Sequence, residues 1–176
     1  MKKSEEIFEI LKQQFSDAVI ELKTDLPVEP IIIIDPMKID KIGLFLRDTN
    51  ELEFDTLLVL SGVDEADGEK VKEGDGSETI TGGKLSVYYH LHSTKLNHKV
   101  TLKVVTPREN PEVASVESIW KAANWHEREV YDMFGVKFHN HPDLRRILLP
   151  YDWEGGYPLR KDFKVPEFYR GMKIPY

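Results

Sequence analysis

The 176-residue chain contains no cysteine, and this absence excludes several kinds of chemistry from the chain itself. It can form no disulfide, offers no thiol nucleophile and holds no cysteine-bound zinc or iron–sulfur cluster. Long hydrophobic runs are also lacking, because the longest aliphatic stretch is Ile31 to Ile34 and a membrane span needs about 20 residues. Residues 1–6 are polar and do not resemble a signal peptide. We therefore expect a cytoplasmic protein that meets a membrane only through a partner.

Basic residues are outnumbered, with 24 Lys and Arg against 31 Asp and Glu and a net charge of −7. An acidic chain argues against nucleic-acid binding, which selects clustered Lys and Arg. The charge is unevenly distributed, because residues 140–176 hold seven basic and five acidic side chains, which is +2, and leave −9 on the first 140 residues. With 40% hydrophobic residues, the chain has enough apolar material for the core of one domain.

The spacing of apolar residues predicts a helix, two strands, a second helix, three strands and a third helix. We expect Ser4 to cap the first helix, Asp35-Pro36 to start the second, and Ser115 to cap a third that runs to about Phe134. The expected strands lie at 18–22, 31–34, 56–63, 84–92 and 100–104, with a hairpin turn at 95–98. This order predicts an α+β domain with helices packed on a mixed, largely antiparallel sheet of about five strands.

Composition divides the chain into an α+β domain at residues 1–138 and an irregular C-terminal arm at residues 139–176. Within the domain, the polar stretch 64–83 predicts a mobile loop. The arm contains five of the ten prolines and seven aromatic residues, so it cannot form a regular helix and is too apolar for a solvated linker. We expect it to dock on a partner protein, with packing against its own domain as the alternative.

Three histidines suggest a metal site, because His90 and His92 share one face of a predicted strand and His98 follows across the turn. However, neither cysteine nor a well-placed carboxylate completes four ligands at this spacing. The loop histidines His139 and His141 are a weaker signal. A solvated strand face explains the first group adequately, and we assign no metal ligand.

The third predicted helix carries the densest group of charges, Glu127-Arg128-Glu129 and Asp132. Paired carboxylates could serve acid–base catalysis, but neither a phosphate-binding loop nor a nucleophile elbow accompanies them. We favour a structural role in which the carboxylates pair with Arg145, Arg146 or other cations of the arm and pin it to the helix. These residues indicate a binding or assembly protein, with no catalytic site expected in this chain.

Two ordered motifs point further. The first begins with E-R-E-V-Y-D-M-F and continues to a histidine, an arginine and two aliphatic residues; its members are Glu127, Arg128, Glu129, Asp132, Met133, Phe134, His141, Arg145, Ile147 and Leu148. The second reads G-Y-P-L-R-K-D-F from Gly156 to Phe163 and includes Pro158, Arg160, Lys161 and Asp162. Together they resemble the signature of the 30-kDa subunit family of respiratory complex I, the NADH–quinone oxidoreductase.

This resemblance implies a non-redox subunit in the hydrophilic arm of a proton-pumping enzyme, peripheral on the cytoplasmic face of the inner membrane. It implies no cofactor in this chain, with FMN, iron–sulfur clusters and quinone bound by partner subunits. It also implies contact with the 49-kDa subunit, which helps to form the quinone pocket, and with other hydrophilic-arm subunits. The signature residues are expected near the junction of domain, arm and partner; they include Arg145, Arg146, Arg160, Lys161 and Asp162.

Alternatives stay open at this point. A related membrane-bound hydrogenase, or a ferredoxin- or F420-type dehydrogenase complex, would contain an equivalent subunit, and the electron donor is not chosen by the sequence. From other classes, a stand-alone metal-dependent hydrolase would use the His90/His92 face or the charged helix. An assembly factor would bind its partners transiently.

Overall fold

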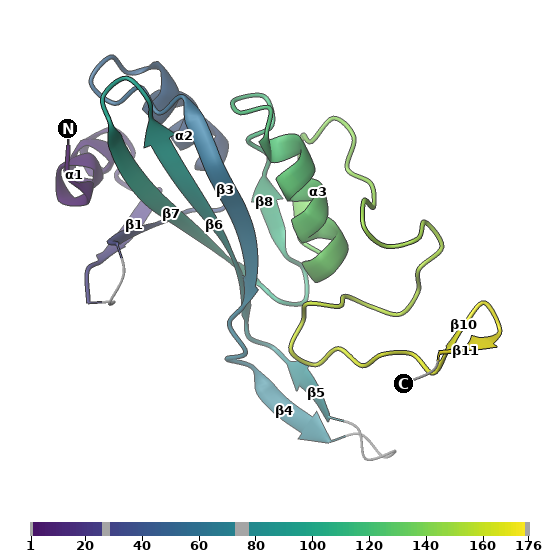
Figure 1. Ribbon diagram of the computed structural model, residues 1–176. Helices are drawn as coiled ribbons and strands as arrows, with labels where there is room; N and C mark the ends of the chain where they lie inside the picture. The colour runs from purple at the N-terminus through teal and green to yellow at the C-terminus, as the bar shows by residue number, and fades with distance from the viewer. Residues whose placement is uncertain (1, 26–28, 73–77, 175–176) are drawn as a thin grey trace.

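A computed structural model of the chain describes residues 2–25, 29–72 and 78–174. Its centre is a five-stranded sheet in the order β1-β2-β7-β6-β3 (Figure 1). Strands β2 and β7 are parallel and the other three pairs are antiparallel, so the predicted mixed sheet is confirmed. The five strands are β1 (Val19–Lys23), β2 (Ile31–Ile34), β3 (Thr56–Asp64), β6 (Lys84–Ser93) and β7 (His98–Pro107).

Three helices complete the α+β fold: α1 (Ser4–Gln14), α2 (Ile39–Asp48) and α3 (Ala123–Phe134). Their apolar sides share one core with alternate residues of the central strands, as the amphipathic spacing predicted. On β6, Val87 and Tyr89 point into this core, whereas Tyr88 and His90 lie on the opposite face and are partly exposed.

The expected caps of the first two helices were wrong. The cap position of α1 is Lys3, and Ser4 is already helical. Helix α2 begins at Ile39, because the Asp35 carboxylate accepts a hydrogen bond from the Met37 N–H at 2.7 Å and closes a turn before the helix. The helical stretches themselves lie where the apolar periodicity predicted them.

Helix α3 begins at Ala123, eight residues after the cap predicted at Ser115. The Ser115 hydroxyl donates to Glu127 in the middle of the helix, and turns occupy the residues between them. Two short parallel strands that the sequence analysis missed, β8 (Glu112–Ala114) and β9 (Lys137–His139), bracket the helix. Strands of three residues are too short for a hydrophobic period to reveal.

The predicted loop at 64–83 contains a hairpin of β4 (Glu69–Lys72) and β5 (Glu78–Thr81), which projects from the end of the sheet (Figure 1). Its polar, glycine-rich composition resembled a loop because both strands lie outside the core. Residues 73–77, part of the stretch predicted to be mobile, lie outside the described residues.

The arm follows α3 along its length and then extends away from the domain (Figure 1). It is irregular, as predicted, apart from the two-residue strands β10 (Phe168–Tyr169) and β11 (Met172–Lys173). Among the helices described, none is long and apolar enough to cross a membrane.

Candidate interface: helix α3 and the C-terminal arm

The buried Asp132 carboxylate is the centre of the contact between α3 and the arm. Its Oδ1 accepts a hydrogen bond from Nη1 of Arg146 at 2.7 Å, which is also an ion pair. Its Oδ2 accepts the N–H groups of three successive residues at 2.8–3.1 Å; these are Ile147, Leu148 and Leu149. One side chain of the helix thus satisfies the polar backbone of an arm segment that has no regular structure.

Burial alone would raise the pKa of Asp132, but the four donors outweigh it and hold the pKa below its usual value. The arm therefore meets an ionised carboxylate near neutral pH. The predicted pairing of Asp132 with an arm cation is confirmed for Arg146. Arg145 instead pairs with Asp143 on the surface.

Arg128 contacts the same segment one helical turn earlier. Its Nε and Nη2 donate to the carbonyl oxygens of Arg145 and Arg146 at 3.2 and 3.3 Å, and its guanidinium lies over the ring of Trp125. Because Arg128 binds carbonyls and Asp132 binds N–H groups, the two side chains bind opposite polarities of one backbone stretch. Their i, i+4 spacing would also allow a direct pair, but both side chains contact the arm.

His141 joins the beginning of the arm to the start of α3. Its Nδ1 accepts from the Asp143 N–H at 3.0 Å, so its Nε2 carries a proton and donates to the Asn124 carbonyl at 3.2 Å. This signature residue therefore fixes a turn, and the geometry accounts for both nitrogens without a metal.

The C-terminal end of α3 provides the next attachment. Leu159 N–H and Arg160 Nε donate to the carbonyl oxygens of Met133 and Phe134, at 3.2 and 2.8 Å. A cation suits the negative end of a helix, and the Arg160 guanidinium also lies 4.5 Å from the centre of the Tyr157 ring. Pro158 sits between these contacts and is partly buried.

A buried ion cluster attaches the arm to the sheet. Arg108, which follows β7, pairs with Asp64 at the end of β3 and with Asp162 of the arm. Asp64 also accepts the backbone N–H of Lys161 at 2.8 Å, while the Lys161 side chain is exposed. Burial would raise the pKa of Asp64, but Arg108 and two N–H donors lower it.

Arg108 and Asp64 were missed by the sequence analysis, although a signal was present. Asp64 continues the alternation of Leu60 and Gly62, and Arg108 continues that of Val104 and Thr106. Both charges are therefore in phase with residues that face the core. Opposite charges at the ends of two buried strand faces predict a pair.

Glu127 is fully buried and faces away from the arm. Its Oε2 accepts from the Ser115 hydroxyl at 2.6 Å and its Oε1 from the Val116 N–H at 2.7 Å. Burial, opposed by these two hydrogen bonds, raises the pKa of Glu127 to about 7. Glu127 holds the segment before α3, whereas Glu129 is exposed on the helix surface.

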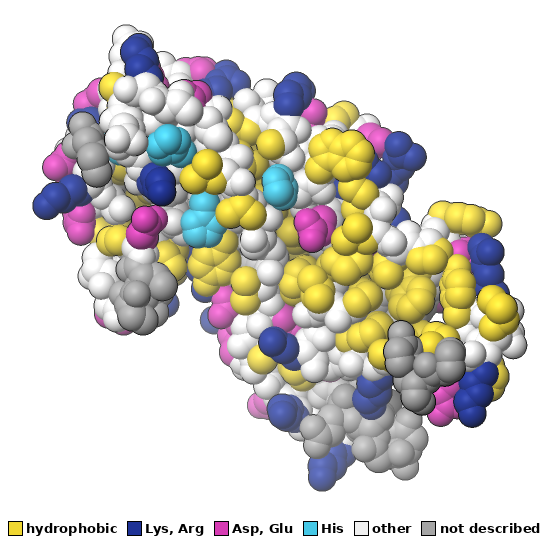
Figure 2. Space-filling model, in the orientation of Figure 1, with side chains coloured by type: hydrophobic (Ala, Val, Ile, Leu, Met, Phe, Trp, Pro, Cys, Tyr) yellow, Lys and Arg dark blue, Asp and Glu magenta, His cyan; other side chains and the backbone are white. Residues whose placement is uncertain are grey.

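Apolar side chains remain exposed over the arm and the adjacent surface of α3. Tyr151 is 88% exposed, and Figure 2 shows hydrophobic side chains gathered in a band over α3 and the arm. We call this surface the arm patch; it comprises Trp125, Leu148, Tyr151, Leu159, Val165, Phe168 and Met172. An exposed patch of this kind is typical of a protein–protein contact.

The histidines considered as metal ligands have separate partners. His98 is buried, with Nε2 2.6 Å from the Leu52 carbonyl and its ring stacked on Phe54, and His90 bonds to the Thr101 hydroxyl. Within the described ranges, no three His, Asp or Glu side chains form a possible metal site.

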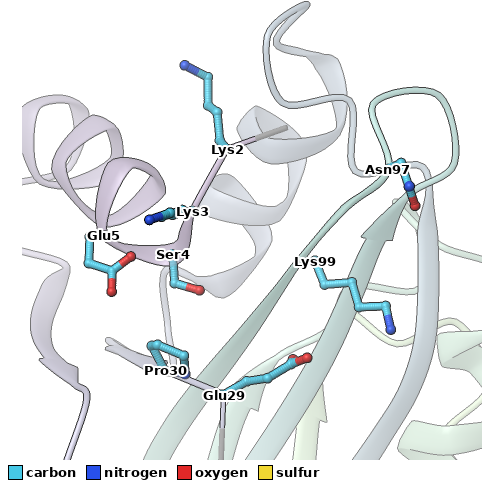
Figure 3. Close-up of a pocket in the computed structure, with 8 residues that line it drawn as sticks. All are labelled: Lys2, Lys3, Ser4, Glu5, Glu29, Pro30, Asn97 and Lys99. Atoms are coloured by element: carbon cyan, nitrogen blue, oxygen red, sulfur yellow. The ribbon is translucent and has the colours of Figure 1, made fainter.

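A hollow of about 510 Å³ at the start of α1 does not build a reaction centre. It is bordered by cations and carboxylates, and the labelled side chains diverge, with Lys2 pointing away from the hollow (Figure 3). Lys2 pairs instead with Glu51 at 2.8 Å.

The motif residues thus build an intramolecular attachment for an arm that carries an exposed apolar patch, which defines the class of a structural assembly protein. The chain belongs to the family of the 30-kDa subunit of respiratory-chain NADH dehydrogenase, whose model matches residues 32–169. The predicted resemblance is confirmed. This membership favours a subunit of NADH–quinone oxidoreductase over a stand-alone hydrolase.

Two relatives, both C-type subunits of NADH-quinone oxidoreductase, show the extent of the similarity. The protein of Chloroherpeton thalassium is 42% identical over 171 residues, which cover 96% of this chain and 64% of the relative. The protein of Chlorobium phaeobacteroides is 41% identical over 170 residues, which cover 96% of this chain and 93% of the relative. The chain therefore spans just under two thirds of the first relative and nearly all of the second.

A solved structure shares the fold. A chain of the membrane-bound sulfane sulfur reductase, an archaeal respiratory membrane complex, has a TM-score of 0.67 and 25% sequence identity. The match covers 93% of this chain and 87% of that chain.

Proposed function

We propose that this chain is a non-redox structural subunit of the hydrophilic arm of a proton-pumping NADH–quinone oxidoreductase. It supports the transfer of electrons from NADH through iron–sulfur clusters to quinone by holding neighbouring subunits in position. The observation that carries this proposal is the use of the family signature: Asp132, Arg128 and Arg160 all bind the chain's own arm. Residues used in this way stabilise a shape, which is the contribution expected of a structural component.

The proposed partners are the 49-kDa subunit and other subunits of the hydrophilic arm. The arm patch supports this, because exposed aromatic and aliphatic side chains next to arginines are typical of the centre of an interface. FMN, iron–sulfur clusters and quinone belong to the partners in this proposal. A chain without cysteine is compatible with that division of labour. Membrane association would occur only through the complex, on the cytoplasmic face of the inner membrane.

The proposed division into a domain at 1–138 and an arm at 139–176 assigns two tasks. Asp132 fixes the arm where it leaves α3, and Arg108 fixes it again at Asp162. Beyond the second attachment, Phe168 and Met172 are exposed. The domain therefore determines the direction of the arm, and the arm presents its apolar side chains to the partner.

Affinity purification of the tagged full chain from detergent-solubilised membranes tests this function. We expect stoichiometric co-purification of iron–sulfur and quinone-site subunits, together with quinone reduction by NADH. Recovery of the chain alone from the soluble fraction would contradict the proposal.

An equivalent subunit of a related respiratory complex is the second candidate. The similarity to a chain of the sulfane sulfur reductase favours keeping it, since that fold occurs in a complex named for another activity. Assaying the purified assembly with NADH, reduced ferredoxin and F420H₂ discriminates between the donors.

A further inference from the structure

Strand β3 forms an edge of the central sheet that lacks the usual protection against further pairing. Among the strands described, only β6 pairs with it, so the N–H and C=O groups along its other side have no strand partner. Its nine residues, T-L-L-V-L-S-G-V-D, contain neither lysine nor proline, and the single charge, Asp64, is at the end. The opposite edge strand, β1, includes Glu21 and Lys23. Exposed edges of natural sheets are normally blocked by charges, prolines or a covering segment.

A groove lies along this unprotected edge. Residues 59–62 form one side of a hollow of about 320 Å³, and His126 and Glu129 of α3 form the other, with Leu159 of the arm beside them. Gly62 permits this arrangement, because a Cβ atom there would lie 2.6 Å from the Phe134 ring. The helix therefore runs close to the strand without a side chain of Gly62 between them. An edge strand flanked by a helix is a known geometry for receiving an extended peptide.

We infer that an extended segment of a neighbouring subunit pairs with β3 in this groove and adds a sixth strand to the sheet. The inference rests on the proposed function, which supplies the neighbouring protein. Leu58 is 48% exposed on the strand, and the apolar band in Figure 2 links this side of the molecule to the arm patch through Leu159. The groove is thus continuous with the surface proposed to face the partner.

Charge indicates the chemistry of the added segment. The exposed Glu129 carboxylate lines the groove, and the first 140 residues of the chain carry a net charge of −9. A second copy of this chain would bring two such acidic domains together edge to edge, which Coulomb repulsion opposes. We therefore assign the groove to a segment with apolar residues for Leu58 and Val59 and with a Lys or Arg for Glu129.

A charge placed on the edge tests this pairing in the full-length tagged chain. Leu58→Lys should reduce the recovery of complex subunits by about tenfold, equivalent to about 1.4 kcal/mol. Ile20→Lys is the matched control, because Ile20 is 59% exposed on the other edge strand, and its recovery should stay at the wild-type level. Thermal unfolding of each purified variant shows that both remain folded. If the thermal midpoint of the Leu58→Lys chain falls, the exchange measurement on the wild-type protein decides.

Hydrogen–deuterium exchange on the wild-type chain, alone and within the complex, provides that measurement. Added-strand pairing predicts that amides of β3 exchange at least about tenfold more slowly in the complex, while those of β1 are unchanged. Equal exchange of β3 in the two states overturns the inference, as does protection of β3 through dimerisation of the isolated chain. If the wild-type chain recovers no complex subunits, the proposed function fails. If it recovers them and β3 remains unprotected, only this inference fails.

Discussion

Asp132 and Glu127 are two buried carboxyl groups on one helix whose pKa values move in opposite directions. Asp132 has four donors, including the Arg146 guanidinium, and its pKa is lowered despite burial. Glu127 has two neutral donors, and burial raises its pKa to about 7. The number and charge of the donors decides the outcome, because each group is desolvated. The two residues consequently respond to different conditions.

Replacing Asp132 tests the attachment of the arm. Asp132→Ala leaves the Arg146 guanidinium and three backbone N–H groups without their acceptor, so we expect the free energy of unfolding to fall by about 2–4 kcal/mol. Glu129→Ala is the control on the same helix, because its side chain is exposed, and should change stability by less than about 0.5 kcal/mol. Urea denaturation measures both. An equal loss in the two variants would contradict the assigned role.

Glu127 predicts a pH dependence of stability. Its folded pKa of about 7 exceeds the ordinary value of 4.5, so its stabilisation is complete below 4.5 and is lost as the pH rises through 7. Asp132 has a lowered pKa and loses its contribution only as the pH falls below its ordinary range. Between pH 5 and 8 the change should therefore come from Glu127.

Glu127→Gln separates this effect from packing. The amide can still accept from Val116 and can donate to the Ser115 oxygen, but it does not ionise. We expect the variant to exceed the wild type by about 2–3 kcal/mol at pH 8 and to match it near pH 4. Urea unfolding at a series of pH values is the measurement, and parallel curves for the two proteins would show that Glu127 does not titrate as assigned.

At the scale of elements, the junction between α3 and the arm depends on the glycine that ends the helix. Gly135 has φ of +80°, its N–H donates to the Tyr131 carbonyl, and an added Cβ would overlap the Tyr157 ring. The absence of a side chain therefore both ends the helix and admits the arm. Sequence analysis predicted the helix end here. It could not predict the arm contact, because Tyr157 is 22 residues away along an irregular path.

Gly135→Ala should disturb this junction more than backbone strain alone would. Gly171→Ala is the matched control, since Gly171 has a similar φ of +76° with no atom within 4 Å of an added Cβ. We expect a loss of about 1 kcal/mol or less for the control and about 2–4 kcal/mol for Gly135→Ala. Thermal unfolding compares them, and an equal shift in Tm would argue against packing of Tyr157 on the helix end.

The helices and long strands were predictable because their apolar residues follow a period of 3.6 or 2. The start of α3 was not, because Ser115 looks like a cap while its hydroxyl donates to a glutamate in the middle of the helix. The hairpin of β4 and β5 escaped because its strands are polar. For the site, Arg146 and Asp132 were foreseen as a pair, whereas Arg108 was absent from both motifs and was recognisable only by its strand phase.

At the scale of the whole molecule, the attachments differ in what they retain if the arm is shortened. A chain ending at Leu149 keeps every contact of Asp132 and Arg128. It loses Asp162 and Arg160, but Arg108 keeps its pair with Asp64. We therefore expect the shortened protein to fold and to lack most of the arm patch.

Co-purification of this shortened chain, compared with the full chain, tests the central claim most directly. Tagged residues 1–149 and 1–176 would be expressed in parallel, their folding compared by circular dichroism, and their partners from detergent-solubilised membranes quantified by mass spectrometry. The account predicts that the full chain recovers stoichiometric complex subunits and that the folded, shortened chain recovers none above background. Recovery of the same subunits in the same amounts by the shortened chain would contradict it.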